Sequence, residues 1–185
     1  MAVTEDNEKR FEEDIESYLL THGGYTKGTQ ETYDREKAIS VSTLIAYLEE
    51  TQANEWRKYQ SVYPNKTPEQ LVKRLNDQIS TNGLLHVLRH GIVDRGVRLK
   101  VASFRPETSL NATVVRDYHA NKLEVLRQFH YSMDNNNSID MVLLLNGIPV
   151  VALELKNQIK GQTVDNAKKQ FMYDRDKRET CFQFN

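Results

Sequence analysis

The sequence has one cysteine, no long apolar run and almost no net charge, and each shortage excludes something. A single cysteine, Cys181, cannot form an internal disulfide. Without an apolar run of membrane-spanning length or an apolar signal segment at the start, we expect no membrane association and a cytoplasmic location. A formal net charge of −1 does not by itself indicate a nucleic-acid-binding protein.

The sequence also lacks a phosphate-binding loop of the form Gly-x-x-x-x-Gly-Lys-Ser/Thr, so we expect no ATP-driven motor within this chain. The charges that are present cluster by sign. The acidic run, which favours a solvated helix face, comprises Glu5, Asp6, Glu8, Glu12, Glu13, Asp14 and Glu16. The basic run, for which a phosphate-facing role and a solvated face both stay open, comprises Lys156, Lys160, Lys168, Lys169, Arg175, Lys177 and Arg178.

The pattern of apolar residues indicates one α/β domain over residues 1–185, with a mainly helical part to about residue 95 and an α/β core after it. Helices are predicted over residues 4–22, 42–60, 67–82, 84–90, 111–120 and 163–174. A polar stretch up to residue 37 is predicted to be a loop. Strands are predicted over residues 97–104, 123–131, 139–156 (a hairpin) and 181–184. Because the last strand is cut short, we expect the chain to be a fragment of a longer protein.

The hairpin carries the candidate site. Its two strands are apolar at nearly every position, which predicts a sheet covered on both faces. Asp140 lies at the start of the first strand, and Glu154 and Lys156 lie at the end of the second. Glu154 and Lys156 share one face of the strand because they are two residues apart. Ionisable groups in buried strands are costly unless something compensates them, and a divalent cation would do so.

The register of the hairpin decides whether the two carboxylates can share a metal. A strict two-residue turn at Asn146-Gly147 would place Asp140 opposite Leu153, on the face away from Glu154. We therefore predict an odd-length loop or a β-bulge near Pro149, which has no N–H for the ladder.

The residue types suit magnesium. Mg²⁺ prefers hard oxygen ligands and keeps several waters, so Asp140, Glu154 and the carbonyl oxygen of Leu155 could hold it. The metal would stabilise charge on a scissile phosphate and activate a water, and Lys156 could position that water or stabilise the transition state. A surface ion pair between Glu154 and Lys156 is the plainer interpretation of the same residues.

These residues resemble the PD-(D/E)XK nuclease superfamily, and more closely the N-terminal nuclease domain of the R subunit of type I restriction–modification enzymes. The resemblance rests on Asp140, the Leu-Leu-Asn-Gly-Ile-Pro run of residues 144–149 and the Glu-Leu-Lys-Asn run of residues 154–157. It extends to residues 44–56 and 161–175. It implies a restriction-endonuclease-like core, a mixed sheet flanked by helices, with an N-terminal helical elaboration.

The resemblance also implies roles for individual residues. Asp140 and Glu154 would be metal ligands, Lys156 the catalytic lysine, and Gln170 the glutamine of a downstream Gln-x-x-x-Tyr element, although Tyr173 follows it by three residues rather than four. Glu12 on the first helix would complete the site. Ile139 replaces the proline that often precedes the aspartate. The basic side chains expected to contact DNA are Lys160, Lys168, Lys169 and Arg175.

The resemblance further implies an endonuclease that hydrolyses double-stranded DNA with Mg²⁺, for which Mn²⁺ can substitute. Its implied partners are the modification and specificity subunits and a helicase-like motor in the parent chain, to which any use of ATP would belong. Two alternatives stay open, namely a non-catalytic docking module of the same fold and a DNA repair nuclease of the same superfamily. A zinc site at His86 and His90 is weaker, since no third ligand is apparent.

Overall fold

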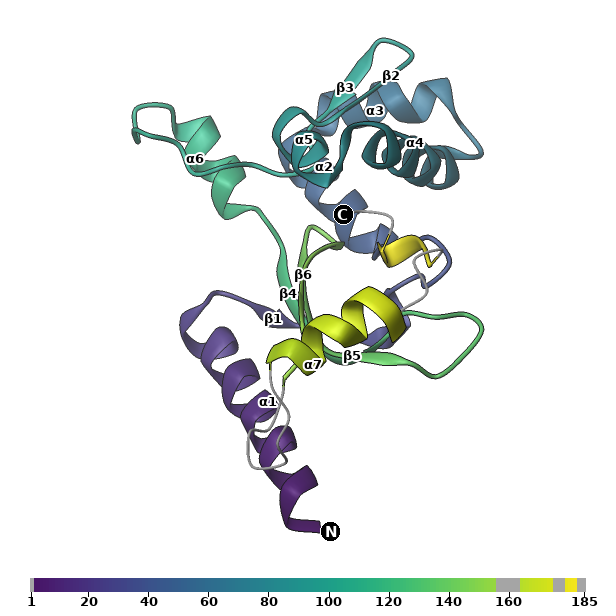
Figure 1. Cartoon of the computed structure of the whole chain (residues 1–185). Helices are drawn as coiled ribbons and strands as arrows, with labels where there is room; N and C mark the ends of the chain where they lie inside the picture. The colour runs from purple at the N-terminus through teal and green to yellow at the C-terminus, as the bar shows by residue number, and fades with distance from the viewer. Residues whose placement is uncertain (1, 156–163, 175–178, 183–185) are drawn as a thin grey trace.

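The protein, seen in a computed structural model, is built around a four-stranded mixed sheet with helices on its flanks (Figure 1). The structure describes residues 2–155, 164–174 and 179–182. The sheet has the strand order β1-β4-β5-β6, with β1 parallel to β4 and the other pairs antiparallel. Its strands are β1 (Thr26–Lys27), β4 (Leu123–His130), β5 (Ser138–Leu145) and β6 (Ile148–Leu153).

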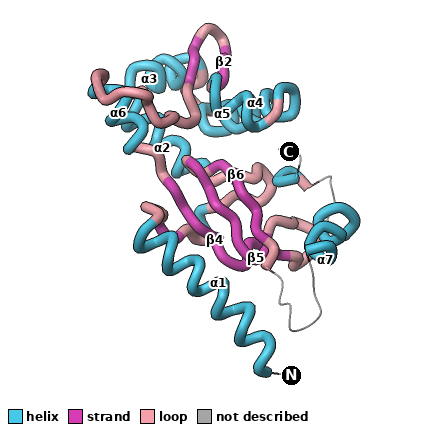
Figure 2. The backbone as a smooth tube through the Cα atoms, turned by 60° about the vertical axis from the view of Figure 1, so that its left-hand side comes forward, coloured by secondary structure: helices cyan, strands magenta, loops and turns pink. Residues whose placement is uncertain are grey.

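Most of the other elements are helices, and several gather at one end of the sheet together with a second, two-stranded sheet (Figures 1 and 2). The α-helices are α1 (Ala2–His22), α2 (Val41–Thr51), α3 (Ala53–Val62), α4 (Thr67–Asn82), α5 (Leu84–His90), α6 (Ala112–His119) and α7 (Val164–Lys169). The small sheet pairs β2 (Ile92–Asp94) with β3 (Val97–Leu99). Short helical turns span Gln30–Thr32, Gln170–Asp174 and Thr180–Phe182.

One hydrophobic core joins the helical end to the sheet. It includes Leu44 and Leu48 of α2, Leu75 of α4, and Val142 and Leu144 of β5, all nearly inaccessible to solvent. Burial of this apolar surface is the main force holding the two parts together. Two elements of the N-terminal half, α1 and β1, lie with the sheet, since β1 is one of its strands and α1 packs against β4 (Figure 1).

The predicted helix over residues 42–60 is interrupted at Gln52, whose backbone leaves the helical region at φ −140° and ψ 41°. The side-chain amide of Gln52 donates to the carbonyl of Lys100 at 2.8 Å and accepts from its N–H at 2.7 Å. These two bonds occupy the main-chain groups that would extend β3. The same contact therefore splits one predicted helix and shortens the strand predicted over residues 97–104.

Three further expectations were wrong. The polar stretch predicted to be a loop contributes β1, where Thr26 and Lys27 pair with β4. Of the strand predicted over residues 181–184, the described residues 181 and 182 belong instead to the helical turn, with the ring of Phe182 packed on Tyr131 at 4.8 Å between centroids, and residues 183–184 lie outside the described residues. Strand β6 is not covered on both faces, since Val151 is 42% exposed; it is the last strand of the sheet among the described residues. In each case the local pattern was overridden by a tertiary contact or by the strand's position in the sheet.

Candidate functional site

The hairpin turn is a two-residue turn held in place by the loops around it. Asn146 and Gly147 both have positive φ, 52° and 79°, as the tight hairpin turn requires, and Leu145 pairs with Ile148. The buried Asn146 side chain accepts from the N–H of Lys122 at 2.7 Å and donates to the carbonyl of Val101 at 2.9 Å. This turn is thus a structural anchor of the hairpin.

Gly147 is required at this turn by space as well as by backbone conformation. A Cβ at this position would lie 2.3 Å from the carbonyl oxygen of Ser40, which itself precedes α2. The same neighbours exchange a main-chain hydrogen bond, from the Ser40 N–H to the Gly147 carbonyl, at 2.9 Å. The Asn-Gly pair therefore ties the hairpin to the helical end of the molecule.

A bulge in β6 shifts the hairpin register in the way predicted. Leu144 pairs with Pro149, but Leu143 pairs with Val151, so that Val150 is the extra residue. Beyond the bulge Met141 lies opposite Leu153, the last pair of the ladder, and extending this register by one position puts Asp140 opposite Glu154. Because cross-strand partners share a face, this register puts Asp140 and Glu154 on the same face of the sheet. The register shift confirms the prediction of a bulge near Pro149, and the alternative of an odd-length loop is not needed.

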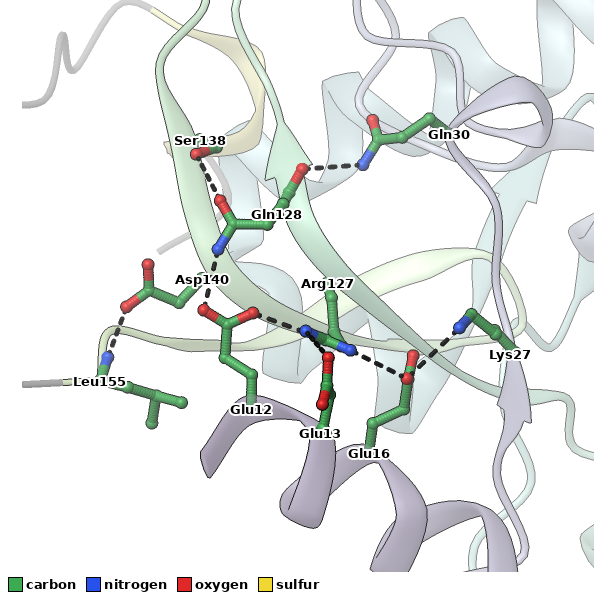
Figure 3. Close-up of polar contacts among 10 residues, drawn as sticks. All are labelled: Glu12, Glu13, Glu16, Lys27, Gln30, Arg127, Gln128, Ser138, Asp140 and Leu155. Atoms are coloured by element: carbon green, nitrogen blue, oxygen red, sulfur yellow. Dashed lines mark hydrogen bonds and ion pairs between the residues drawn. The ribbon is translucent and has the colours of Figure 1, made fainter. Parts of the chain in front are cut away.

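The Asp140 carboxylate is tied to the end of β6. Its Oδ2 accepts a 2.6 Å hydrogen bond from the main-chain N–H of Leu155 (Figure 3). A carboxylate has two oxygens, so this bond engages one of them. The side chains of Asp140 and Glu154 are both partly exposed, which leaves this edge of the sheet accessible to a ligand.

Two acidic residues of α1, Glu12 and Glu16, lie against β4 rather than in solvent, so the solvated face predicted for the N-terminal run is wrong at these two positions. Glu12 and Glu16 are only 5% and 7% exposed. Arg127 of β4 donates from Nε to Glu12 at 3.2 Å and from Nη1 to Glu16 at 3.4 Å, and Glu13 lies 3.5 Å from its Nη2 (Figure 3). Lys27 of β1 also contacts Glu16, at 3.3 Å.

The cluster holds Arg127 firmly in its charged form. Burial acts to lower the pKa of Arg127, but the hydrogen bonds that it donates to Glu12 and Glu16, together with their negative charges, outweigh this effect and raise the pKa above its usual value. Desolvated charges of this kind are tolerated only when paired. Arg127 is the one charged residue among the odd-numbered positions from 123 to 131, and this exception was the available sequence signal for the contact, which sequence reasoning did not identify.

Gln128 links Glu12 to the hairpin and was also missed. Its Nε2 donates to Oε1 of Glu12 at 2.9 Å, and its Oε1 accepts from the Ser138 hydroxyl at 3.3 Å (Figure 3). Because Arg127 pairs with Met141 and Phe129 with Ile139, Gln128 lies opposite Asp140 in the register. Glu12 is thus brought to the Asp140 end of β5, with hydrogen bonds to both of its oxygens.

The other predicted site residues are distributed as follows. Lys156, Lys160 and Arg175 lie outside the described residues. Helix α7 lies beside the open end of the hairpin in both views, and Gln170 begins the turn that follows this helix (Figures 1 and 2). In the described part of the chain, Gln170 makes no hydrogen bond to Asp140, Leu155 or Glu12. Lys168 and Lys169 are exposed on α7, and Lys168 lies 3.9 Å from Asp165.

The donor set at the hairpin fits a magnesium ion without a large protein cage. Mg²⁺ is usually held by one or two carboxylates and retains waters, and Asp140, Glu154 and the Leu155 carbonyl offer such oxygens. No group of three or more His, Cys, Asp or Glu side chains with metal-binding geometry occurs within residues 2–155, 164–174 and 179–182. The rings of His86 and His90 lie tilted at 44° to each other with their centroids 4.4 Å apart, and they gain no third ligand within the same residues.

Comparisons with known proteins assign the chain to a family. A family model described as the type I restriction enzyme R protein N terminus matches residues 6–185. No curated protein and no solved structure gives a match. None of the described helices is long and apolar enough to cross a membrane. The match covers nearly the whole sequence, and the chain therefore belongs to the family of N-terminal regions of type I restriction enzyme R proteins.

Proposed function

We propose that this chain is the metal-dependent endonuclease domain of a type I restriction R protein, hydrolysing phosphodiester bonds of double-stranded DNA. The observation that supports the proposal is the bulge at Val150: the register beyond it, extended from Met141 and Leu153 by one position, matches Asp140 with Glu154. Glu154 precedes Lys156 by two residues in the sequence. A regular hairpin would separate the two carboxylates onto opposite faces.

Three groups of the chain have distinct roles in this proposal. Asp140 and Glu154 hold the metal, with the Leu155 carbonyl as a further oxygen ligand. The Leu155 N–H donates to Asp140 and so orients that carboxylate. Lys156 positions the attacking water or stabilises the negative transition state. Bound Mg²⁺ (or Mn²⁺) supplies charge neutralisation at the scissile phosphate and lowers the pKa of a bound water.

Binding of DNA would depend on basic side chains beyond the hairpin. Lys168 and Lys169 are exposed on α7, close in the chain to Gln170. The proposal includes Lys160 and Arg175 in the same phosphate-binding role. Because these contacts would be to phosphates, cleavage itself should show little sequence specificity.

The same family membership favours a restriction subunit over a repair nuclease. On this proposal the chain acts in the cytoplasm with modification and specificity subunits and with a helicase-like motor in the parent protein, and ATP serves that motor. The superfamily assignment to PD-(D/E)XK nucleases is part of the proposal, supported by the Asp140, Glu154 and Lys156 spacing.

The test separates cutting from translocation in the assembled restriction enzyme. Asp140→Ala or Lys156→Ala should reduce DNA cleavage by about 100-fold or more, because a metal ligand or a transition-state donor is removed. ATP-driven translocation should be retained in both variants. Retained cleavage would refute the nuclease site, and loss of translocation as well would indicate the docking role instead.

A further inference from the structure

Two successive residues of β4 both reach helix α1, which a regular strand does not allow. Arg127 binds Glu12 and Glu16, and its neighbour Gln128 binds Glu12 (Figure 3). In a regular strand adjacent side chains point to opposite faces. Gln128 departs from strand geometry with φ +47°, a region that non-glycine residues seldom occupy. This local turn of the backbone lets both side chains meet the same carboxylate.

The arrangement of hydrogen bonds gives the Gln128 amide one orientation. Glu12 can only accept, so the Nε2 of Gln128 must face it, at 2.9 Å. The opposite Oε1 accepts from the Ser138 hydroxyl at 3.3 Å, and the main-chain carbonyl of Gln128 accepts from Gln30 at 3.4 Å. Contacts on three sides therefore maintain an uncommon backbone conformation.

Core packing does not account for Gln128. Its side chain is exposed, whereas Leu126, two residues before it, and Phe129, the residue after it, are 3% and 1% exposed and belong to the core. Strained, polar and accessible residues of this kind are more typical of functional sites than of packing. The register places it opposite Asp140, at the accessible end of the hairpin.

We infer that Gln128 is a positioning residue of the metal site: it holds the Glu12 carboxylate of α1 at the Asp140 end of β5, in the outer surroundings of the ion and not as a third ligand. Gln128 acts through Glu12 and does not itself ligate the metal. The inference rests on the proposed function, since it assumes a metal at Asp140 and Glu154. Partners of this outer kind fix the orientation of acidic groups around a bound ion.

The experiment measures Mn²⁺ binding to this chain by calorimetry, with thermal unfolding in EDTA as a metal-independent readout. Gln128→Gly keeps the left-handed backbone accessible and removes the amide. We expect it to weaken Mn²⁺ binding by about 10-fold and to leave the metal-free unfolding midpoint within about 2 °C. Gln128→Asn, which is too short to reach Glu12, should behave in the same way. Gln78→Ala is the matched control, because the Gln78 side chain of α4 also donates to a main-chain carbonyl, that of Val93, away from the hairpin, and this variant should bind Mn²⁺ as the wild type does.

A double-mutant cycle tests whether Gln128 acts through Glu12. In a Glu12→Gln background, Gln128→Gly should cause no further loss of affinity, since the carboxylate it positions is gone. Losses of Mn²⁺ affinity that add up in the double variant would overturn the inference. Unchanged Mn²⁺ binding in Gln128→Gly would also overturn it if Asp140→Ala abolishes binding. If Asp140→Ala binds as well as the wild type, the proposed metal site itself fails. Absence of saturable binding in the wild type leaves Gln128 no site to order and also overturns the inference.

Discussion

The main-chain N–H of Leu155 lies 2.6 Å from Oδ2 of Asp140, so the end of strand β6 is bound to the side chain that opens β5. This contact closes the open end of the hairpin, opposite the Asn146-Gly147 turn at its other end. It exists because one additional residue, Val150, advances β6 by one position relative to β5.

Shifting the register beyond the bulge should remove the site. Deletion of Ala152 moves the residues after it by one position along β5, so that Asp140 faces Leu155 and Glu154 lies on the other face. We expect DNA cleavage by the assembled enzyme and Mn²⁺ binding by this chain both to be lost. Deletion of Val150 is the control, because it removes the bulge but leaves Asp140 opposite Glu154, and it should retain both. A circular dichroism spectrum of each deletion variant verifies that it is folded, and retained cleavage in a folded Ala152 deletion variant would show that the register is irrelevant.

Arg127 should be important for stability because it neutralises carboxylates that are mostly buried. The side chains of Arg127, Glu12 and Glu16 are 18%, 7% and 9% exposed. Arg127→Ala leaves two carboxylates in a poorly solvated site, and we expect a loss on the order of 3 kcal/mol in the free energy of unfolding measured with urea. Glu13→Ala removes the 50% exposed partner and should cost less than about 1 kcal/mol. Equal effects of the two substitutions would show that burial does not govern this cluster.

Glu124 should make the protein less stable as the pH rises. Burial raises the pKa of this carboxyl above its ordinary 4.5, against a smaller opposing effect of a hydrogen bond with Thr43, and its Oε2 has no hydrogen-bond partner within the described structure. A raised folded-state pKa favours folding below the ordinary value, and this contribution is lost as the pH rises through the folded-state pKa.

Glu124→Gln should therefore increase the urea-unfolding free energy at pH 8, by about 1 kcal/mol or less because the group is half-buried, and should have little effect at pH 4. The exposed Glu107→Gln serves as control, with changes within about 0.5 kcal/mol at both pH values. A stabilisation of Glu124→Gln that is the same at pH 4 and pH 8 would contradict the ionisation argument.

The hairpin turn should not accept a side chain at Gly147. A Cβ there meets the Ser40 carbonyl oxygen at 2.3 Å in addition to requiring φ 79°. We expect Gly147→Ala to lower the free energy of unfolding by more than about 2 kcal/mol. Gly96→Ala is a matched control, because Gly96 has φ 82° and no atom within 4 Å of an added Cβ, so it reports backbone strain alone. Equal losses for the two glycines would mean that the contact with Ser40 has no energetic weight.

Much of the hairpin could be predicted because its determinants are local. The Asn-Gly turn has a strong backbone preference, the flanking strands are apolar, and the positions of Asp140 and Glu154 required a bulge if they were to share a face. The bulge was inferred from the chemistry assigned to the two carboxylates, and the structure contains it at Val150.

The surroundings of the hairpin could not be predicted, because they depend on residues far apart in the sequence. Arg127 contacts Glu12 across more than a hundred positions. The helix break at Gln52 comes from the main chain of Lys100, and Thr26 joins the sheet beside Glu124. None of these contacts produces a periodic pattern in the sequence, since each joins only one or two residues of different elements.

The sequence by itself determined the secondary structure of the hairpin and most helices, the family resemblance and the residue types of the candidate site. Those features follow from local backbone preferences and from the alternation of apolar residues, which act over a few positions. Only the tertiary structure decided that α1 packs against β4, that Glu12 and Glu16 are buried, and that Gln128 bridges Glu12 toward Asp140. The reason is physical: burial and ion pairing depend on which surfaces meet, and that is settled by the packing of the whole chain.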